Sequence, residues 1–172
     1  MSLIIRPIRE KETNAVYQMF QDIPSVENGS GNKANGLTPE EFDNFCKLNV
    51  SYAKNEGLPE GRVPQTIYLI FDNDIPVGFG KFRPFLNEDC MQRKIGHFAY
   101  MISPKFRNRG FATQFLSFIK KEAEQLGLTE IEGGALKDNL ASRRVMEKNG
   151  GKIKEEPGDE VIYVIPLHPN SR

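Results

Sequence analysis

The chain has 172 residues, a length typical of one domain, and its 38% hydrophobic and 27% charged residues are those of an ordinary soluble globular protein. Lysine and arginine total 23, and aspartate and glutamate also total 23, so the formal net charge is zero. Proteins that coat nucleic acid by neutralising phosphates carry a net basic excess, so nucleic acid is not an expected partner.

Membrane and metal partners are also not expected. No apolar run approaches the roughly 18 residues needed to cross a bilayer, and the N-terminus lacks the apolar core of a signal peptide. Cys46 and Cys90 have no CxxC spacing, and with His97 and His168 they form no zinc-ligand pattern. We therefore expect reduced thiols, no metal and a cytoplasmic location.

The N-terminal third begins with a predicted strand over residues 3–8 and a short amphipathic helix over residues 11–20. Residues 24–36 are rich in glycine, asparagine and serine, which predicts a loop. This loop is long for a compact domain, and such loops are often functional or mobile.

A second helix is predicted to start at Thr38, which would be its N-cap. Pro39 suits the first helical position, and Glu41 completes a capping box with Thr38. One side of this helix is expected to bury four apolar or aromatic residues: Phe42, Phe45, Leu48 and Tyr52. Two strands follow over residues 65–71 and 76–82, joined by a hairpin turn.

The second half of the chain alternates strands and helices. Residues 96–103 predict a strand, 111–126 the most regular amphipathic helix, 129–136 a strand and 139–148 a helix. Residues 153–167 predict a hairpin-like pair of strands. Because a strand–helix–strand unit requires parallel strands and a hairpin requires antiparallel ones, we expect an α/β fold with a mixed sheet and flanking helices.

The segment between the predicted strand and the most regular helix carries the strongest functional pattern. A helix N-terminus exposes unpaired N–H groups and the positive end of a dipole, so it favours an anion. Gly110 and Ala112 are small enough to let a phosphate approach the backbone. Lys105, Arg107 and Arg109 add local positive charge. The segment is either a phosphate-binding loop or an exposed basic loop that caps a helix.

This segment resembles the acetyl-CoA-binding signature of the GNAT superfamily of N-acetyltransferases. That signature, Arg/Gln-x-x-Gly-x-Gly/Ala, reads here Arg107-Asn108-Arg109-Gly110-Phe111-Ala112. A second family element, Asn-x-x-Ser…Glu-Lys-x-Gly, is matched from Asn139 to Gly150. The resemblance is firm over residues 95–151, looks like that of a bacterial-type branch, and is consistent with the remainder of the chain.

The resemblance implies the fold and the cofactor. The GNAT acyl-CoA N-acyltransferase fold has a central mixed, mostly antiparallel sheet with a parallel splayed strand pair and flanking helices. Here it would form a single domain over residues 1–167, followed by a short tail over 168–172. The co-substrate would be acetyl-CoA, with no metal.

The family pattern also implies which residues contact acetyl-CoA. One strand's backbone would pair with the pantetheine arm, the following loop's amides would hold the pyrophosphate, and Asn139 would hydrogen-bond the pantetheine near Ser142. The alternative role of Asn139 is an ordinary helix N-cap. The expected cofactor-binding residues are Tyr100, Met101, Ile102, Arg107, Asn108, Arg109, Gly110, Phe111, Ala112, Thr113, Asn139 and Ser142.

The candidate catalytic residues are His97, Glu132 and Tyr100. Transfer to an amine requires a neutral nitrogen, donors for the oxyanion and a proton or other stabilisation for the departing thiolate. Many relatives place a tyrosine acid where this chain has Met146, which cannot donate a proton and is expected to pack in the core. Tyr100, Tyr163 or solvent could replace it. His97 or Glu132 could be the base, or they could be a sheet histidine and a solvated carboxylate.

The acceptor site is expected between residues 24–58 and 82–93, where four acids could attract a cationic amine: Asp22, Glu27, Glu88 and Asp89. The leading hypothesis is an acetyl-CoA-dependent N-acetyltransferase that acts on a primary amine of a small molecule or protein. The alternatives are a CoA-binding sensor without turnover and an unrelated nucleotide-binding protein, for which the chain offers no Walker motif. A late strand such as residues 161–165 could contribute to a homodimer.

Overall fold

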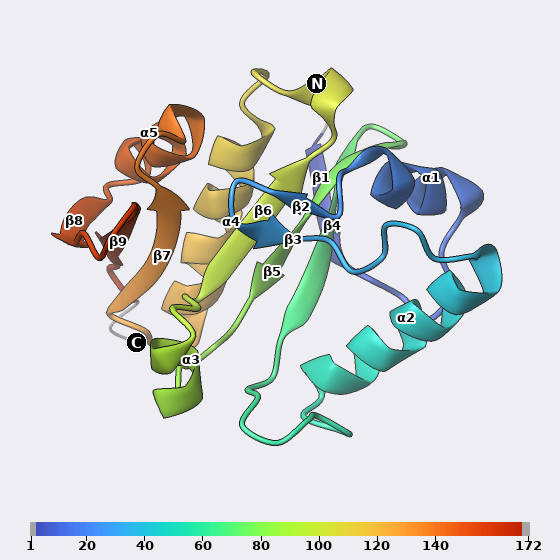
Figure 1. Ribbon diagram of the computed structural model, residues 1–172, viewed down its shortest axis with the longest axis horizontal. Helices are drawn as coiled ribbons and strands as arrows, with labels where there is room; N and C mark the ends of the chain where they lie inside the picture. Colours follow the sequence, from blue (N-terminus) through green and yellow to red (C-terminus); the bar gives the residue numbers. More distant parts are fainter. Residues whose placement is uncertain (1–2, 170–172) are drawn as a thin grey trace.

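The computed structural model describes residues 3–169, which form two larger sheets and one two-stranded sheet, with helices packed against them (Figure 1). A four-stranded antiparallel sheet has the order β1-β4-β5-β6, made of β1 (Leu3–Pro7), β4 (Thr66–Asp72), β5 (Ile75–Phe82) and β6 (Phe98–Ile102). A three-stranded sheet has the order β7-β9-β8, made of β7 (Glu130–Leu136), β9 (Glu160–Pro166) and β8 (Lys152–Glu155). The helices are α1 (Asn14–Asp22), α2 (Pro39–Ala53), α3 (Glu88–Gln92), α4 (Phe111–Gln125) and α5 (Leu140–Lys148).

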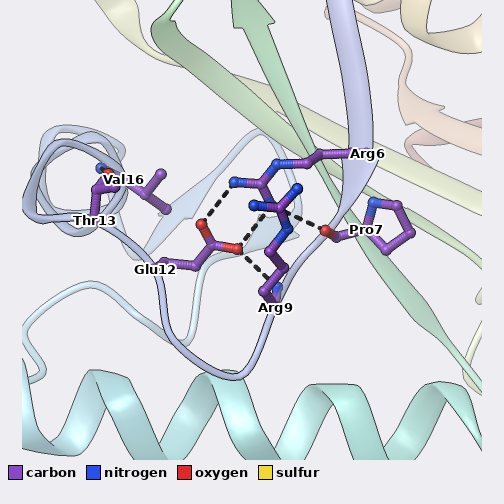
Figure 2. Close-up of polar contacts among 6 residues, drawn as sticks. All are labelled: Arg6, Pro7, Arg9, Glu12, Thr13 and Val16. Atoms are coloured by element: carbon purple, nitrogen blue, oxygen red, sulfur yellow. Dashed lines mark hydrogen bonds and ion pairs between the residues drawn. The ribbon is translucent and has the colours of Figure 1, made fainter.

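The first helix begins three residues later than the pattern predicted, and Figure 2 shows why. The buried carboxylate of Glu12 accepts two hydrogen bonds of 2.8 Å from the Arg6 guanidinium and one of 2.7 Å from the Arg9 N–H. These bonds hold the chain in a turn up to Thr13, whose hydroxyl then accepts from the Val16 N–H and caps α1. Pairing with Glu12 raises the pKa of Arg6.

Helix α2 starts as predicted, with the reciprocal bonds between Thr38 and Glu41 both present. Its buried face differs from the expectation. Phe42, Cys46 and Asn49 are buried, whereas Leu48 is 47% exposed and was wrongly assigned to the core. Leu48 lies beside a cavity, which the amphipathic pattern alone cannot distinguish from a packed interface.

Residues 24–36, predicted as a loop, contain a small hairpin of β2 (Val26–Glu27) and β3 (Ser30–Gly31). Asn28 and Gly29 form its turn at φ angles of 49° and 82°, the left-handed conformation that tight hairpin turns need. The side-chain amide of the buried Asn32 donates to the carbonyls of Phe20 and Ile23, both at 2.9 Å. The segment is therefore held firmly against the end of α1.

Two apolar clusters lie on opposite faces of the main sheet. One packs α1 and α2 on the sheet around Phe20, Phe42 and Phe79. The other packs α4 between the sheet and β7–β9, and it includes Met146, which is 1% exposed as the core prediction required. The packing is close: a Cβ atom at Gly80 would lie 2.1 Å from the Phe115 ring.

The two sheets touch at one end only, between β6 and β7. The His97 N–H donates to the Glu132 carbonyl at 2.8 Å, and the Glu132 N–H donates to His97 Nδ1 at 3.0 Å. Beyond this contact the strands belong to different sheets, although Figure 1 shows both running in the same direction. This is the expected parallel splayed pair within a mixed, mostly antiparallel fold.

Strand β9 is the central strand of its sheet, paired with β7 on one side and β8 on the other. Its backbone hydrogen-bonding groups are therefore taken, and residues 161–165 cannot extend the sheet into a second copy by edge pairing. In the described part of the chain, no helix is both long and apolar enough to cross a membrane.

Candidate active site

The loop from β6 to α4 presents backbone amides at a helix N-terminus. A short 3-10 turn, Pro104–Phe106, is followed by Asn108 at φ 61° and Gly110 at φ 84°, and Gly110 occupies the N-cap position of α4. Within residues 3–169, no side chain caps this helix. Because the first N–H groups of a helix have no partner within it, an anion at this point would receive several hydrogen bonds.

Two of the three cations of this loop are paired with carboxylates. Arg107 Nη2 lies 2.6 Å from Glu27 Oε1 in the hairpin, and Lys105 Nζ lies 3.3 Å from Asp22 Oδ2 at the end of α1. Arg107 Nε also donates to the Ile102 carbonyl at 3.1 Å. Arg109 instead lies over the Phe106 ring. The groups that remain available to bind an anion are therefore the backbone N–H groups of the loop and the Arg109 side chain.

The β6 edge that faces β7 is available to a ligand only at alternate residues. Arg83 N donates to the His97 carbonyl and Ser103 N donates to the Val77 carbonyl, which sets the register of the β5–β6 ladder. In this register the peptide groups of Met101 face β5, whereas those of Tyr100 face the gap. Of the three residues expected to meet the pantetheine, Tyr100 therefore has the exposed backbone groups, and the Ile102 carbonyl is bonded by Arg107.

Tyr100 bridges the gap between β6 and α5. Its hydroxyl lies 2.8 Å from the Ser142 hydroxyl and 3.3 Å from the Ser142 carbonyl, and its ring packs near Phe98 and Phe115. Burial raises the pKa of Tyr100 to about 12, so the hydroxyl keeps its proton at neutral pH. Asn139 accepts from the Ser142 N–H at 3.3 Å, as a helix N-cap does.

The two candidate bases, His97 and Glu132, both have partners. Since His97 Nδ1 accepts from the Glu132 N–H, the neutral ring carries its proton on Nε2, and burial lowers its pKa. The Glu132 carboxylate lies 2.8 Å from Lys154 Nζ. The other tyrosine considered, Tyr163, is buried and accepts from Arg143 Nε at 3.1 Å.

A cavity of about 560 Å³ lies on the α2 side of the main sheet and reaches the gap between β6 and β7. Its wall includes Tyr52 of α2, Phe79 of β5, Tyr100 of β6 and Leu136 of β7. The β2–β3 hairpin, which crosses β6 in Figure 1, closes one side. Among the described residues, the lining includes Tyr100 and Met101 of the expected site but neither His97 nor Glu132.

The charge of this cavity is opposite to what the acidic residues suggested. Three of the four acids expected to attract an amine form ion pairs, Asp22 with Lys105, Glu27 with Arg107 and Asp89 with Arg93, and none of the four lines the cavity. The lining instead includes Lys81 of β5 and Arg83, which directly follows that strand, and neither was identified from the sequence. Lys81 shares a strand face with the buried Phe79, and the period-two spacing of 79, 81 and 83 was the available indication.

Comparison with known proteins agrees with the geometry. The acetyltransferase (GNAT) domain family matches residues 2–152. RimL, a ribosomal alpha-N-protein acetyltransferase in complex with coenzyme A, superposes with a TM-score of 0.74 at 17% identity, covering 98% of this chain and 96% of that one. A GNAT acetyltransferase from Streptococcus pneumoniae has a TM-score of 0.64 at 20% identity, covering 97% and 100%. PaiA N-acetyltransferase from Thermoplasma acidophilum, in complex with coenzyme A, has a TM-score of 0.62 at 14% identity, covering 97% and 100%.

None of the curated proteins is a significant sequence match. The structural likenesses, all at low identity, establish the fold, and the family match covers most of the chain. With the splayed strands and the amide-rich loop in place, this protein belongs to the GNAT superfamily of N-acetyltransferases.

Proposed function

We propose that the protein transfers the acetyl group of acetyl-CoA directly to a primary amine. The observation that carries this proposal is the continuity between the uncapped N-terminus of α4 and the cavity, which are joined by β6. A pyrophosphate held by the amides of residues 107–113 and a pantetheine arm along Tyr100 would bring the thioester to the cavity. Direct attack there needs no protein nucleophile.

The proposed reaction uses a proton donor that the chain supplies. The amine nitrogen attacks the thioester carbon, the new C–N bond forms, and the C–S bond breaks to release CoA thiolate. The Tyr100 hydroxyl donates its proton to that sulfur and regains one from solvent through the Ser142 hydroxyl, 2.8 Å away. Tyr100 would thereby replace the tyrosine that relatives carry at the position of the buried Met146.

We assign removal of the amine proton to water rather than to His97 or Glu132. In the observed arrangement, His97 Nδ1 is occupied by a backbone N–H and Nε2 carries the proton, so neither nitrogen can accept another. The Glu132 carboxylate is paired with Lys154. These contacts support a positioning role for both residues where β6 and β7 begin to separate.

The test is thermal unfolding with acetyl-CoA, CoA, ATP or NAD at equal concentration, followed by thiol release with a panel of amines. A ligand at about 100 times its Kd stabilises the folded state by roughly 2.7 kcal/mol. Stabilisation by the CoA species alone, with thiol release, is expected. Stabilisation without release from any amine would instead favour a CoA-binding sensor, the second candidate that Met146 suggests. No stabilisation by either CoA species would overturn both.

We also propose a cytoplasmic location. Cys46 and Cys90 are both free thiols in the structure, as a reducing compartment allows.

A further inference from the structure

The cavity concentrates positive charge in a chain whose net charge is zero. Six basic residues line it, against a single acid, Glu160: Lys33, Arg62, Lys81, Arg83, Arg93 and Lys94. They come from the segment after β3, the segment before β4, strand β5 and the residue that follows it, and the two residues that follow α3. Only Arg93 has a carboxylate within ion-pair distance in residues 3–169, namely Asp89 at 3.4 Å.

Lys81 and Arg83 are the innermost of these cations. Lys81 Nζ donates to the Gly31 carbonyl at 3.3 Å, and Arg83 Nη1 donates to the Gly96 carbonyl at 2.9 Å. An ammonium has three N–H donors and a guanidinium five, so most of their donors have no protein partner among the described residues. Burial, together with the nearby cations Arg83 and Lys33, lowers the pKa of Lys81 to about 8.

Half-buried cations without a counter-ion are costly. Glu27 and Asp22 pair with Arg107 and Lys105 on the loop before α4, and not with the cations of the cavity. The cavity therefore retains uncompensated positive charge beside the point where the thioester would enter. In the β5–β6 ladder, Lys81 is paired with Ala99, the residue before Tyr100.

We propose that the acceptor is an amine that also carries a carboxylate or phosphate group, and that Lys81 and Arg83 bind this anionic group while the amine faces Tyr100. This inference rests on the proposed function, because the cavity is an acceptor site only if acetyl transfer takes place. Lys81 and Arg83 then determine which acceptor binds, whereas the amine nitrogen and the thioester carbon react beside β6.

The experiment compares matched amines with and without an anionic group. Binding of glucosamine 6-phosphate and glucosamine, and of glycine and glycinamide, is measured by calorimetry, and thiol release from acetyl-CoA is measured with the same four compounds. Within the pair that fits the cavity, we expect the more anionic member to bind and react at least tenfold better. The phosphate pair and the carboxylate pair distinguish the two sources of charge.

The variants are Lys81→Met and Arg83→Met, with Lys121→Met as the matched control, because Lys121 is exposed on α4 and lies outside the cavity. Each cavity variant is expected to weaken binding of the preferred anionic compound at least tenfold while leaving the Kd of acetyl-CoA within twofold. Lys81→Arg should retain most of the binding. A methionine here also relieves a half-buried charge, so the folded state should be kept.

Equal binding of the members with and without the anionic group, in both pairs, would overturn the inference, as would a cavity variant that weakens acetyl-CoA binding instead. Anion binding that depends on Lys81, without thiol release from any amine, would overturn the proposed function but leave the anion site standing. The two failures are therefore distinguishable.

Discussion

The loop before α4 and the cavity on the α2 side of the main sheet are both rich in basic residues. Among the described residues, most of the side-chain charges are neutralised in the loop, whereas most are left without counter-ions in the cavity. In the loop, Arg107 and Lys105 are held by Glu27 and Asp22, and anion binding is left to backbone amides. In the cavity, the partners of the Lys81 and Arg83 side chains in the described part of the chain are backbone carbonyls, with no carboxylate. A basic residue in a sequence can thus be a structural tie or a ligand-binding group, and the tertiary partner decides which.

This difference suits two different ligands. Backbone amides at a helix N-terminus can bind one invariant pyrophosphate without the entropy cost of ordering long side chains. The acceptor, by contrast, can differ from one enzyme to another, and side-chain charges can be changed by substitution to match it whereas backbone amides cannot. Four predictions test the two regions and the residue between them, in order of decreasing effect.

Tyr100 lies between the two regions, and its replacement should have the largest effect. Tyr100→Phe removes the proposed proton donor, and loss of general acid catalysis should lower kcat about 100-fold or more without changing the Kd of acetyl-CoA. Ser142→Ala removes the hydroxyl through which Tyr100 would regain its proton, 2.8 Å away, but leaves the proton donor itself, so it should lower kcat less than Tyr100→Phe does. If both variants keep kcat within twofold of the wild type, solvent protonates the thiolate.

Gly110 tests the loop alone. It adopts φ 84°, and a Cβ atom added at this position would meet nothing closer than Gln114 Nε2 at 3.9 Å, so a substitution acts through the backbone. A β-branched residue in this conformation costs more than the roughly 1–2 kcal/mol typical of L-residues, so Gly110→Val should raise the Kd of acetyl-CoA about tenfold. Gly110→Asn, which tolerates this φ, should change it much less. Calorimetry decides, and anion binding in the cavity should be unaffected in both.

Lys81 gives the cavity a pH dependence that the loop lacks. Its pKa is lowered to about 8, so the ammonium loses its proton in the folded protein as pH rises through that value. Affinity for succinate, whose charge is constant from about pH 7 to 9.5 because carboxyl groups titrate near pH 4, should therefore fall several-fold over this range. Arg83, with its pKa lowered to about 10, keeps most of its charge there. The other groups around the cavity are Lys33, Arg62, Arg93, Lys94, Glu160, Tyr52, Cys90 and Tyr100.

The same pKa shift has a consequence for stability. Because the folded state holds the Lys81 proton less tightly than the unfolded chain, the unfavourable contribution of Lys81 to the free energy of unfolding is relieved as pH rises from about 8 towards 10.5.

Lys81→Arg tests the assignment of the pH dependence to Lys81. It should abolish the pH dependence of succinate affinity and keep the affinity itself. An unchanged pH profile in that variant would assign the titration to another group.

The Glu27–Arg107 contact should have the smallest effect. Both side chains are partly exposed, and such ion pairs contribute about 0.2–1 kcal/mol. A double-mutant cycle with Glu27→Gln and Arg107→Gln, followed by urea unfolding, should give a coupling free energy in that range that falls with added salt. Zero coupling would mean that this ion pair does not help to hold the hairpin beside the loop before α4.

Local sequence patterns correctly predicted those structural features whose interactions span only a few residues. The capping box of Thr38 and Glu41 and the N-cap Asn139 each act within one helical turn. The apolar periodicity of residues 111–126 predicted α4 to within one residue, because one continuous face of that helix is buried. The fold class followed from the order of these elements.

Only the tertiary structure decided the charge of the cavity. Lys33, Arg62, Lys81 and Lys94 lie up to 61 residues apart in the sequence (94 − 33), and the folded sheet and the segments around it bring them to one cavity. Glu27 and Asp22 looked equally suited to an amine, yet the hairpin and the end of α1 place them against Arg107 and Lys105. Ion pairs and cavities depend on distances between elements, and a period along one element carries no information about those distances.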